Sequence, residues 1–252
     1  MAVDIRRPLK KILPHLLAAR DQNLNEADTV QRLVKFFEDV LGYDAMSEIT
    51  REKQVKDRFV DLAIRIDGTV RFLIEAKSAA TILRDRHIEQ AEHYAANDNI
   101  RWVLLTNGVM WNLYHLTFEE GIESTRVFSI DLGGDITDDC AECLGLLHRN
   151  AVRKDALEDY WQHKAALNPA SLGKSLFSED VLRIIRRDIR KREEIQIDED
   201  DLVAALHGLF SADAREQMGP PKVRRRRKTK KTEPVISVKD VLAKLPREVE
   251  PV

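Results

Sequence analysis

The apolar residues of the chain recur first at helical spacing and then in alternation, and this change of period divides its N-terminal half. Residues 4–20 and a second segment that starts near Asn25 carry apolar side chains every three or four positions, which predicts two helices. Gly42 lies just past the second helix, where glycine commonly ends one. From residue 47 the period changes to two, with many β-branched and aromatic residues, which predicts strands. The predicted strands are 47–52, 57–66 and 70–77.

Beyond these strands, helical and extended patterns follow one another. A helix over 85–96 precedes strands at 102–108 and 110–117 and an edge strand at 127–132. Residues 136–163 return to a helical pattern. This order predicts an α/β or α+β fold with a mixed central sheet flanked by helices.

The C-terminal part of the chain is helical at first and then linker-like. Helices are predicted over 178–193, with Ser178 as the cap, and from Asp198 to about Leu209. From Ser211 onward, glycine, prolines and a basic run predict a disordered tail with one short helix, SVKDVLAKL. We therefore expect a first domain at 1–150, a helical extension at 151–210 and a basic tail at 211–252.

Composition narrows the choice of function only slightly. The 252 residues are 43% hydrophobic, enough for a sizeable core, and the formal net charge is -2, so any nucleic-acid surface must come from local clustering. The N-terminus lacks the apolar run of a signal peptide or membrane span, so we expect a cytoplasmic protein without a membrane partner. Cys140 and Cys143 have no second pair to complete a zinc site and are interpreted as ordinary helical thiols.

Three charged residues in the predicted hairpin supply the candidate chemistry. Glu75 and Lys77 are two positions apart on an otherwise apolar strand, so they share a face. Asp61 lies among apolar residues of the preceding strand. Burying such charges is costly unless a cation and a phosphate compensate them. Two carboxylates suit Mg²⁺ or Mn²⁺, and a lysine beside the metal can orient or deprotonate a water, since burial and the metal can lower its pKa.

The position of Asp61 depends on the length of the hairpin loop. A two-residue loop at Asp67-Gly68 pairs Asp61 with the residue before Glu75 and sends it to the opposite face of the sheet. A three-residue loop, over 67–69 or 66–68, returns Asp61 to the face of Glu75. We therefore expect an odd loop.

The segment RFVDLAIRIDGTVRFLIEAKSA resembles the core of P-D-(D/E)-x-K nucleases, with Val60 in place of the proline. More narrowly, residues 22–132 resemble the N-terminal nuclease domain of type I restriction enzyme motor subunits and its stand-alone relatives. IEQAEHYA matches the Q-x-x-x-Y helix of that family, and WVLLTNGVMWNLYHL matches its strand with T-N-G and then W-x-x-Y. The resemblance implies a restriction-endonuclease-like fold and a DNA-cleaving activity.

The resemblance also implies roles for the strand residues. Asp61 and Glu75 would bind the metal, and Lys77 would position the attacking water. No glycine lies five positions before the Gly173-Lys174-Ser175 segment, so ATP is not expected as a cofactor.

Three further residues have both a functional and a structural interpretation. The resemblance implies that Gln90 and Tyr94 help to hold the site or the DNA strand, and that Glu26 reaches the metal from the second helix. From the residues alone, Gln90 and Tyr94 equally serve to cap and pack their helix. Glu26 equally serves as a first-turn carboxylate that favours the helix dipole.

Two groups of arginines are candidate contacts for DNA phosphates. One forms a stripe at helical spacing and the other opens the basic tail: Arg183, Arg186, Arg187 and Arg190, and Arg224, Arg225, Arg226 and Arg227. Such contacts give salt-sensitive, sequence-blind affinity. Without a nuclease beside them, both groups are equally well explained as solvated surface.

The sequence favours a Mg²⁺-dependent DNA endonuclease of the restriction type, with DNA as its partner and a homodimer or restriction-complex subunits as further partners. Two alternatives stay open. One is a nuclease fold that binds DNA or a protein without cleaving. The other is a nuclease subunit of a larger restriction or defence assembly.

Overall fold

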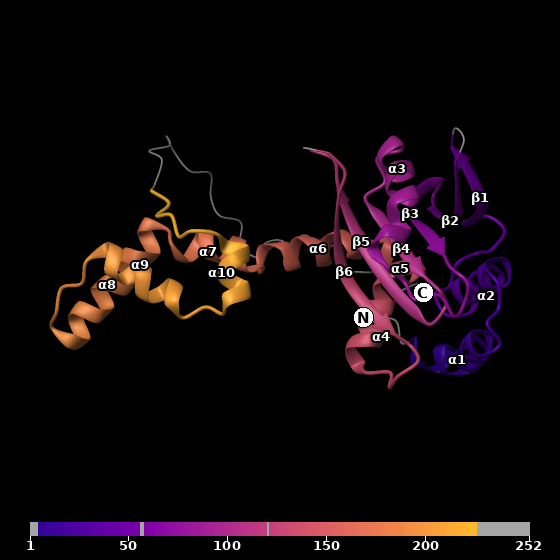
Figure 1. Ribbon diagram of the computed structural model, residues 1–252, viewed down its shortest axis with the longest axis horizontal. Helices are drawn as coiled ribbons and strands as arrows, with labels where there is room; N and C mark the ends of the chain where they lie inside the picture. Colours follow the sequence, from indigo (N-terminus) through magenta and orange to yellow (C-terminus); the bar gives the residue numbers. More distant parts are fainter. Residues whose placement is uncertain (1–4, 56–57, 120, 226–252) are drawn as a thin grey trace, which may run out of the picture. The chain divides into compact units, whose positions relative to one another are not determined.

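The computed structural model describes residues 5–55, 58–119 and 121–225, and its ribbon is shown in Figure 1. The chain divides into two compact units, Met1–Ala165 and Ala166–Val252. The helices of the first unit are α1 (Arg6–Asp21), α2 (Glu26–Asp39), the 3₁₀ helix η1 (Asp85–Ile88), α3 (Glu89–Asn97), α4 (Asp138–Leu146), α5 (Arg149–Arg153) and α6 (Ala156–Ala166), whose last residue opens the second unit. Its strands are β1 (Ile49–Val55), β2 (Arg58–Ile66), β3 (Thr69–Ala76), β4 (Trp102–Thr106), β5 (Met110–Thr117) and β6 (Glu123–Asp131).

The strands form one mixed sheet in the order β1-β2-β3-β4-β5-β6, which can be followed in Figure 1. β3 and β4 are parallel, and the other neighbouring strands are antiparallel. Parallel neighbours need a crossover connection, which η1 and α3 supply here. The predicted α/β fold with a mixed sheet flanked by helices is therefore confirmed.

Both faces of this sheet are covered by apolar packing. On one face, side chains of α1, α2, α4 and α5 pack on the sheet around Phe36, Phe37 and Trp111. On the other face, α3 packs through Ala91, Tyr94 and other residues onto β3 and β4. The central strands β4 and β5 are thus buried on both sides.

The helical pattern predicted over 136–163 is divided into three helices. His148 accepts a hydrogen bond from the backbone N–H of Asn150 and so starts α5. Asp155 adopts a left-handed φ of 58° just before α6 and interrupts the helix there. Cys140 and the neighbouring Cys143 lie in α4 as free thiols.

The β2–β3 hairpin closes with a two-residue loop, so the predicted odd loop was wrong. Asp67 and Gly68 both have left-handed φ angles, 52° and 79°, as a tight turn with two left-handed residues requires. The strand pairs nearest the turn are Ile66–Thr69, Arg65–Val70 and Ile64–Phe72. Arg71 is therefore an extra residue in β3, a β-bulge that shifts the pairing by one position.

This bulge, and not the loop, returns Asp61 to Glu75. The last strand pair away from the turn is Leu62–Ile74, so the next position sets Asp61 opposite Glu75. The Arg71 guanidinium donates to the carbonyl oxygen of Val152 at 3.2 Å and to the carboxylate of Asp155. The extra residue is thus anchored to the segment between α5 and α6.

The second unit is helical, with α7 (Pro169–Leu176), α8 (Glu179–Glu193), α9 (Glu199–Gly208) and α10 (Ala212–Met218). Its small core is built from Phe177, Leu182, Leu202 and Val203. The linker expected from Ser211 is instead helical at first, because Ser211 Oγ accepts from the backbone N–H of Ala214 and caps α10. The short helix predicted at 237–245 lies outside the described residues. The functional division at residues 150 and 210 stays a prediction.

None of the helices that the structure describes is long and apolar enough to cross a bilayer.

Trp111→Ala should lower the free energy of unfolding by about 3–5 kcal/mol, the range for removing a large aromatic side chain from a packed core. Trp111 is fully buried, and its ring centroid lies 4.6 Å from that of Phe36. Urea unfolding followed by circular dichroism measures the change. Met46→Ala truncates an exposed side chain and should stay within about 0.5 kcal/mol of wild type. Equal losses in both variants would contradict the assigned core.

Candidate active site

The charged residues of the hairpin meet at the end of β3, beyond its last pair with β2. The backbone N–H of Ala76 donates to Asp61 Oδ2 at 2.7 Å. The next backbone N–H, of Lys77, donates to the carbonyl oxygen of Thr106 at 2.9 Å and continues the pairing with β4. The Asp61 side chain therefore takes the place of a strand partner, which fixes its carboxylate beside Glu75.

Lys77 links two carboxylates from different elements. Its Nζ lies 2.5 Å from Glu75 Oε1 and 3.5 Å from Glu26 Oε2. Glu26 is the first residue of α2, and Asn25 caps that helix by accepting from the backbone N–H of Asp28 at 2.8 Å. The structure thus brings Glu26 to the predicted site through Lys77, while its role as a metal ligand stays a prediction.

Glu75 is the most buried charged group of the site, with 7% of its surface exposed. Burial, together with the negative charges of Asp61 and Glu26, raises the pKa of Glu75 to about 7, against the opposing effect of Lys77. A nearby divalent cation would favour the ionised form of such a carboxyl. The carboxyl therefore changes protonation in the range where most enzymes work.

Without a bound metal, the pKa of Lys77 is raised. Burial lowers the pKa, but the hydrogen bond with Glu75 and the charges of Glu75, Glu26 and Asp61 raise it by more. In the metal-free site, Lys77 is therefore an ammonium group that donates hydrogen bonds.

The residues of the site fit a hard divalent cation. Across the described ranges, no group of three or more His, Cys, Asp or Glu side chains is placed to hold a metal ion. Mg²⁺, however, is commonly held by one or two carboxylates together with waters and phosphate oxygens. Asp61 and Glu75 supply two, and the repulsion that raises the pKa of Glu75 is the kind that a divalent cation relieves. They fit Mg²⁺ or Mn²⁺ as the protein ligands.

The two predicted residues of α3 differ in their surroundings. Tyr94 is 1% exposed, and its ring packs in the core formed with β3 and β4. Gln90, one turn earlier, is exposed. The ring of Tyr94 thus has the packing role, and the catalytic roles of both residues stay predictions.

Asn107 has a structural role that sequence reasoning missed. Asn107 Oδ1 closes the turn after β4 by accepting from the backbone N–H of Met110 at 2.7 Å. Its Nδ2 also donates to the carbonyl oxygen of Thr81 at 2.9 Å. Asn107 therefore ties the segment that follows Lys77 to the end of β4. A polar residue directly after a buried strand was the available signal.

The arginine stripe lies on α8, in the second unit, and its members are exposed. The Arg183 guanidinium pairs with the carboxylate of Asp180. Arg186 Nε donates to the carbonyl oxygen of Ile197 at 2.9 Å. The outward direction of Arg187 follows from the helical period, because Leu182 on the opposite side is buried.

The start of the basic run is fixed beside the same helix. The backbone N–H of Arg224 donates to the carbonyl oxygen of Phe177 at 2.9 Å. The carbonyl oxygen of Arg224 accepts from the backbone N–H of Glu179 at 3.1 Å. Arg225 is exposed, whereas Arg226 and Arg227 lie outside the described residues. Two basic segments that are distant in sequence are thus neighbours within the second unit.

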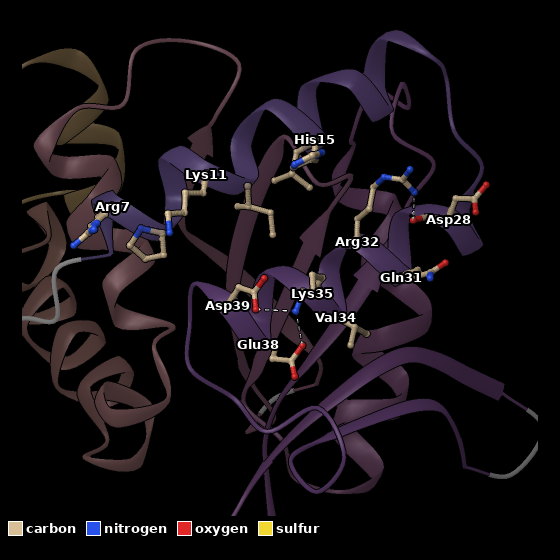
Figure 2. Close-up of a pocket in the computed structure, with 13 residues that line it drawn as sticks. Arg7, Lys11, His15, Asp28, Gln31, Arg32, Val34, Lys35, Glu38 and Asp39 are labelled. Carbon is tan, nitrogen blue, oxygen red and sulfur yellow. Dashed lines mark hydrogen bonds and ion pairs between the residues drawn. The ribbon is translucent and has the colours of Figure 1, made fainter.

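A separate groove of about 1080 Å³ lies between α1 and α2 (Figure 2). Arg7, Lys11 and His15 line it from α1. On the α2 side, Lys35 Nζ pairs with Glu38 at 3.1 Å and also with Asp39. The charges of this groove largely cancel, and no predicted site residue lines it.

Residues 25–125 match the family described as the type I restriction enzyme R protein N terminus. The match covers 101 of the 252 residues and supports a restriction-enzyme nuclease-like domain in this segment. The role of the segment is accordingly related to restriction nucleases. The matched segment contains every predicted site residue of the first unit, namely Glu26, Asp61, Glu75, Lys77, Gln90 and Tyr94, and it ends before the arginines of the second unit.

Among solved structures, the chain is similar to the type IIG restriction endonuclease BpuSI, with 13% identity and a TM-score of 0.37. The similarity covers 74% of this chain and 24% of that chain, so the chain spans about a quarter of the length of that enzyme. No curated protein matches the sequence significantly.

Glu75→Gln should change the dependence of stability on pH. The pKa of Glu75 is about 7 in the folded state, against 4.5 for a model carboxyl, so the folded state holds this proton more tightly than the unfolded state. Its contribution to the free energy of unfolding therefore falls as the pH rises from the unfolded value to the folded value. Between about pH 5 and pH 8, metal-free wild type should lose about 2 kcal/mol relative to Glu75→Gln.

Urea unfolding in a chelating buffer at both pH values measures this difference. Glu38→Gln neutralises an exposed carboxylate of α2 and should follow the wild-type pH dependence. Parallel curves for wild type and Glu75→Gln would show that the burial and repulsion assigned to Glu75 are absent.

Proposed function

We propose that this chain is a DNA endonuclease that uses Mg²⁺ or Mn²⁺ to hydrolyse phosphodiester bonds with water. The observation that supports it is the meeting of Asp61, Glu75 and Lys77 at the end of β3, with one carboxylate bound to a backbone N–H and the other to the lysine. The family match of residues 25–125 supports a nuclease over other uses of such a cluster.

The carboxylates and the lysine of the site would have different roles in the reaction. When bound between Asp61 and Glu75, the divalent ion would lower the pKa of a water and offset the charge that builds on the phosphate. Lys77 donates to the Glu75 carboxylate and to the carbonyl oxygen of Ala76, and its third N–H would donate to the attacking water or a phosphate oxygen. Glu26 helps to keep Lys77 protonated and oriented, because its carboxylate lies on the same ammonium.

The second unit would hold DNA without reading its sequence. Its exposed arginines on α8 and the neighbouring Arg224 and Arg225 are suited to phosphate contacts. Such contacts would increase the time that a duplex remains near the nuclease.

A subunit of a larger restriction assembly is a second candidate, favoured by the surface of the second unit. Five large apolar side chains are exposed there: Leu167, Leu172, Ile184, Ile195 and Leu209. Single exposed apolar residues are common on protein surfaces, whereas a contiguous patch of them would mark a surface that binds another protein. In that case the nuclease would act on DNA delivered by its partners.

Lys77→Ala should lower DNA cleavage by at least about 100-fold, as expected for the loss of a group that acts on the attacking water. The assay uses supercoiled plasmid and single-stranded DNA with Mg²⁺, with Mn²⁺ and with a chelator. Asp61→Ala should be similarly inactive. Lys35→Ala is the matched control, because Lys35 is an exposed lysine of α2 paired to two carboxylates away from the site.

Melting temperatures of these variants show whether the fold survives. Wild-type cleavage by folded Lys77→Ala would exclude the proposed site. Cleavage that persists in the chelator would exclude the metal.

Arg187→Ala combined with Arg190→Ala should weaken DNA binding and make it less sensitive to salt. Each lost phosphate contact reduces the slope of log affinity against log salt by about 0.9, so the double variant should lose about 1.8. Fluorescence anisotropy with a labelled duplex measures the slope. An unchanged slope would mean that the stripe is only solvated surface.

A further inference from the structure

The segment between Lys77 and α3 is held in place from several sides. Ser78 Oγ lies 2.6 Å from Thr81 Oγ1, and the carbonyl oxygen of Thr81 accepts from Asn107 Nδ2 at 2.9 Å. The backbone N–H of Ala79 donates to the carbonyl oxygen of Leu24 at 3.1 Å. The residues that follow are therefore positioned relative to the end of β3.

A local hydrogen-bond pair sets the orientation of His87. The backbone N–H of Arg84 donates to His87 Nδ1 at 3.2 Å, and the backbone N–H of His87 donates back to the carbonyl oxygen of Arg84 at 2.9 Å. Nδ1 is thus an acceptor, so the neutral imidazole has its proton on Nε2 and can donate from there.

His87 lies within electrostatic reach of Lys77. Burial lowers the pKa of His87, and the charges of Arg86, Lys77 and Arg84 lower it further. The ring is therefore neutral at neutral pH, and it is grouped with three cationic side chains.

The acidic residue of the same short helix is turned to other partners. Asp85 accepts from the hydroxyl of Tyr114 at 2.7 Å and lies 3.7 Å from Arg126 Nη1. Arg84 and Arg86 are exposed, and neither is seen in an ion pair within the described ranges. The segment therefore presents positive charge and hydrogen-bond donors that nothing on the same short helix neutralises.

The surroundings of Lys77 thus contain charges of both signs. Glu26 and Glu75 lie against its ammonium group, Asp61 lies beside Glu75, and His87 of the basic segment is within electrostatic reach of Lys77. A phosphodiester at a metal held by the carboxylates needs donors on its remaining oxygens, and guanidinium groups and a neutral imidazole N–H supply them.

We propose that Arg84, Arg86 and His87 form a phosphate-binding rim that holds the DNA backbone against Lys77. This inference rests on the proposed nuclease function and adds residues that bind the substrate. The two arginines hold phosphates beside the scissile one, whereas His87 Nε2 donates to an oxygen of the scissile phosphate itself. The arginines therefore act mainly on affinity and the histidine on the rate of cleavage.

The test compares rim variants with matched controls in the full chain. Arg84→Ala combined with Arg86→Ala removes the arginine contacts, and Arg101→Ala is the control. Arg101 is exposed and precedes β4, at the end of that strand opposite to Thr106. His87→Ala removes the imidazole, and His93→Ala, an exposed histidine of α3, is its control.

Binding of a labelled DNA duplex is measured with Ca²⁺ over a series of KCl concentrations, and plasmid cleavage with Mg²⁺ is measured on the same preparations. The double arginine variant should lose about 1.8 from the salt slope, or about 0.9 for each phosphate contact. Arg84→Lys with Arg86→Lys should keep the slope, because the charges remain. His87→Ala should lower the cleavage rate at saturating DNA by about 100–1000-fold, the range for one donor at a reacting oxygen, with affinity nearly unchanged.

The possible outcomes distinguish a failure of the rim proposal from a failure of the nuclease proposal. Binding and a salt slope equal to those of Arg101→Ala would overturn the rim, whether or not wild type cleaves. If wild type binds DNA and fails to cleave it while the double variant binds weakly, the nuclease proposal is wrong and the phosphate contacts are supported. Wild type that neither binds nor cleaves DNA would overturn both. Equal cleavage by His87→Ala and His93→Ala would remove His87 from the rim.

Discussion

The extra residue in β3 determines which side chains of the hairpin face one another. A two-residue turn with Asp67 and Gly68 is favourable locally, but on its own it places Asp61 and Glu75 on opposite faces. The bulge at Arg71 allows both the tight turn and the pairing of Asp61 with Glu75, because it shifts the register of the strand pairs beyond the turn. The hydrogen bonds of Arg71 to Val152 and Asp155 hold the bulge against the segment between α5 and α6. The geometry of the site therefore depends on tertiary contacts of a residue that takes no part in its chemistry.

The second constraint is electrostatic. Three carboxylates and one ammonium group lie together at the end of β3 in an apolar sheet. Burial and the neighbouring negative charges raise the pKa of Glu75. Lys77 compensates two of these carboxylates at once, which explains why its own pKa is raised despite burial. Excess negative charge remains beside the lysine, and the basic segment with His87 is within its electrostatic reach. This arrangement suits a reaction that brings a cation and a phosphate together.

Sequence patterns were sufficient for features that depend on neighbours in the chain. The period of two placed Glu75 and Lys77 on one face, and their contact confirms it. The bulge was not predictable, because Asp155, which holds it in place, is distant in sequence. The alternation of apolar and polar residues in β3 also does not indicate whether a bulge is present. The contact of Glu26 with Lys77 depends on how α2 packs, and only the resemblance suggested it. The capping of α10 by Ser211 was missed because the glycine and prolines that follow dominate the local composition.

The near-neutral carboxyl of Glu75 has a consequence for how the site would respond to its surroundings. A proton and a metal ion cannot occupy this carboxylate together, so the two are competitors for one position. In the proposed metal site, binding of a cation by Glu75 would therefore release the proton that this carboxyl holds below about pH 7.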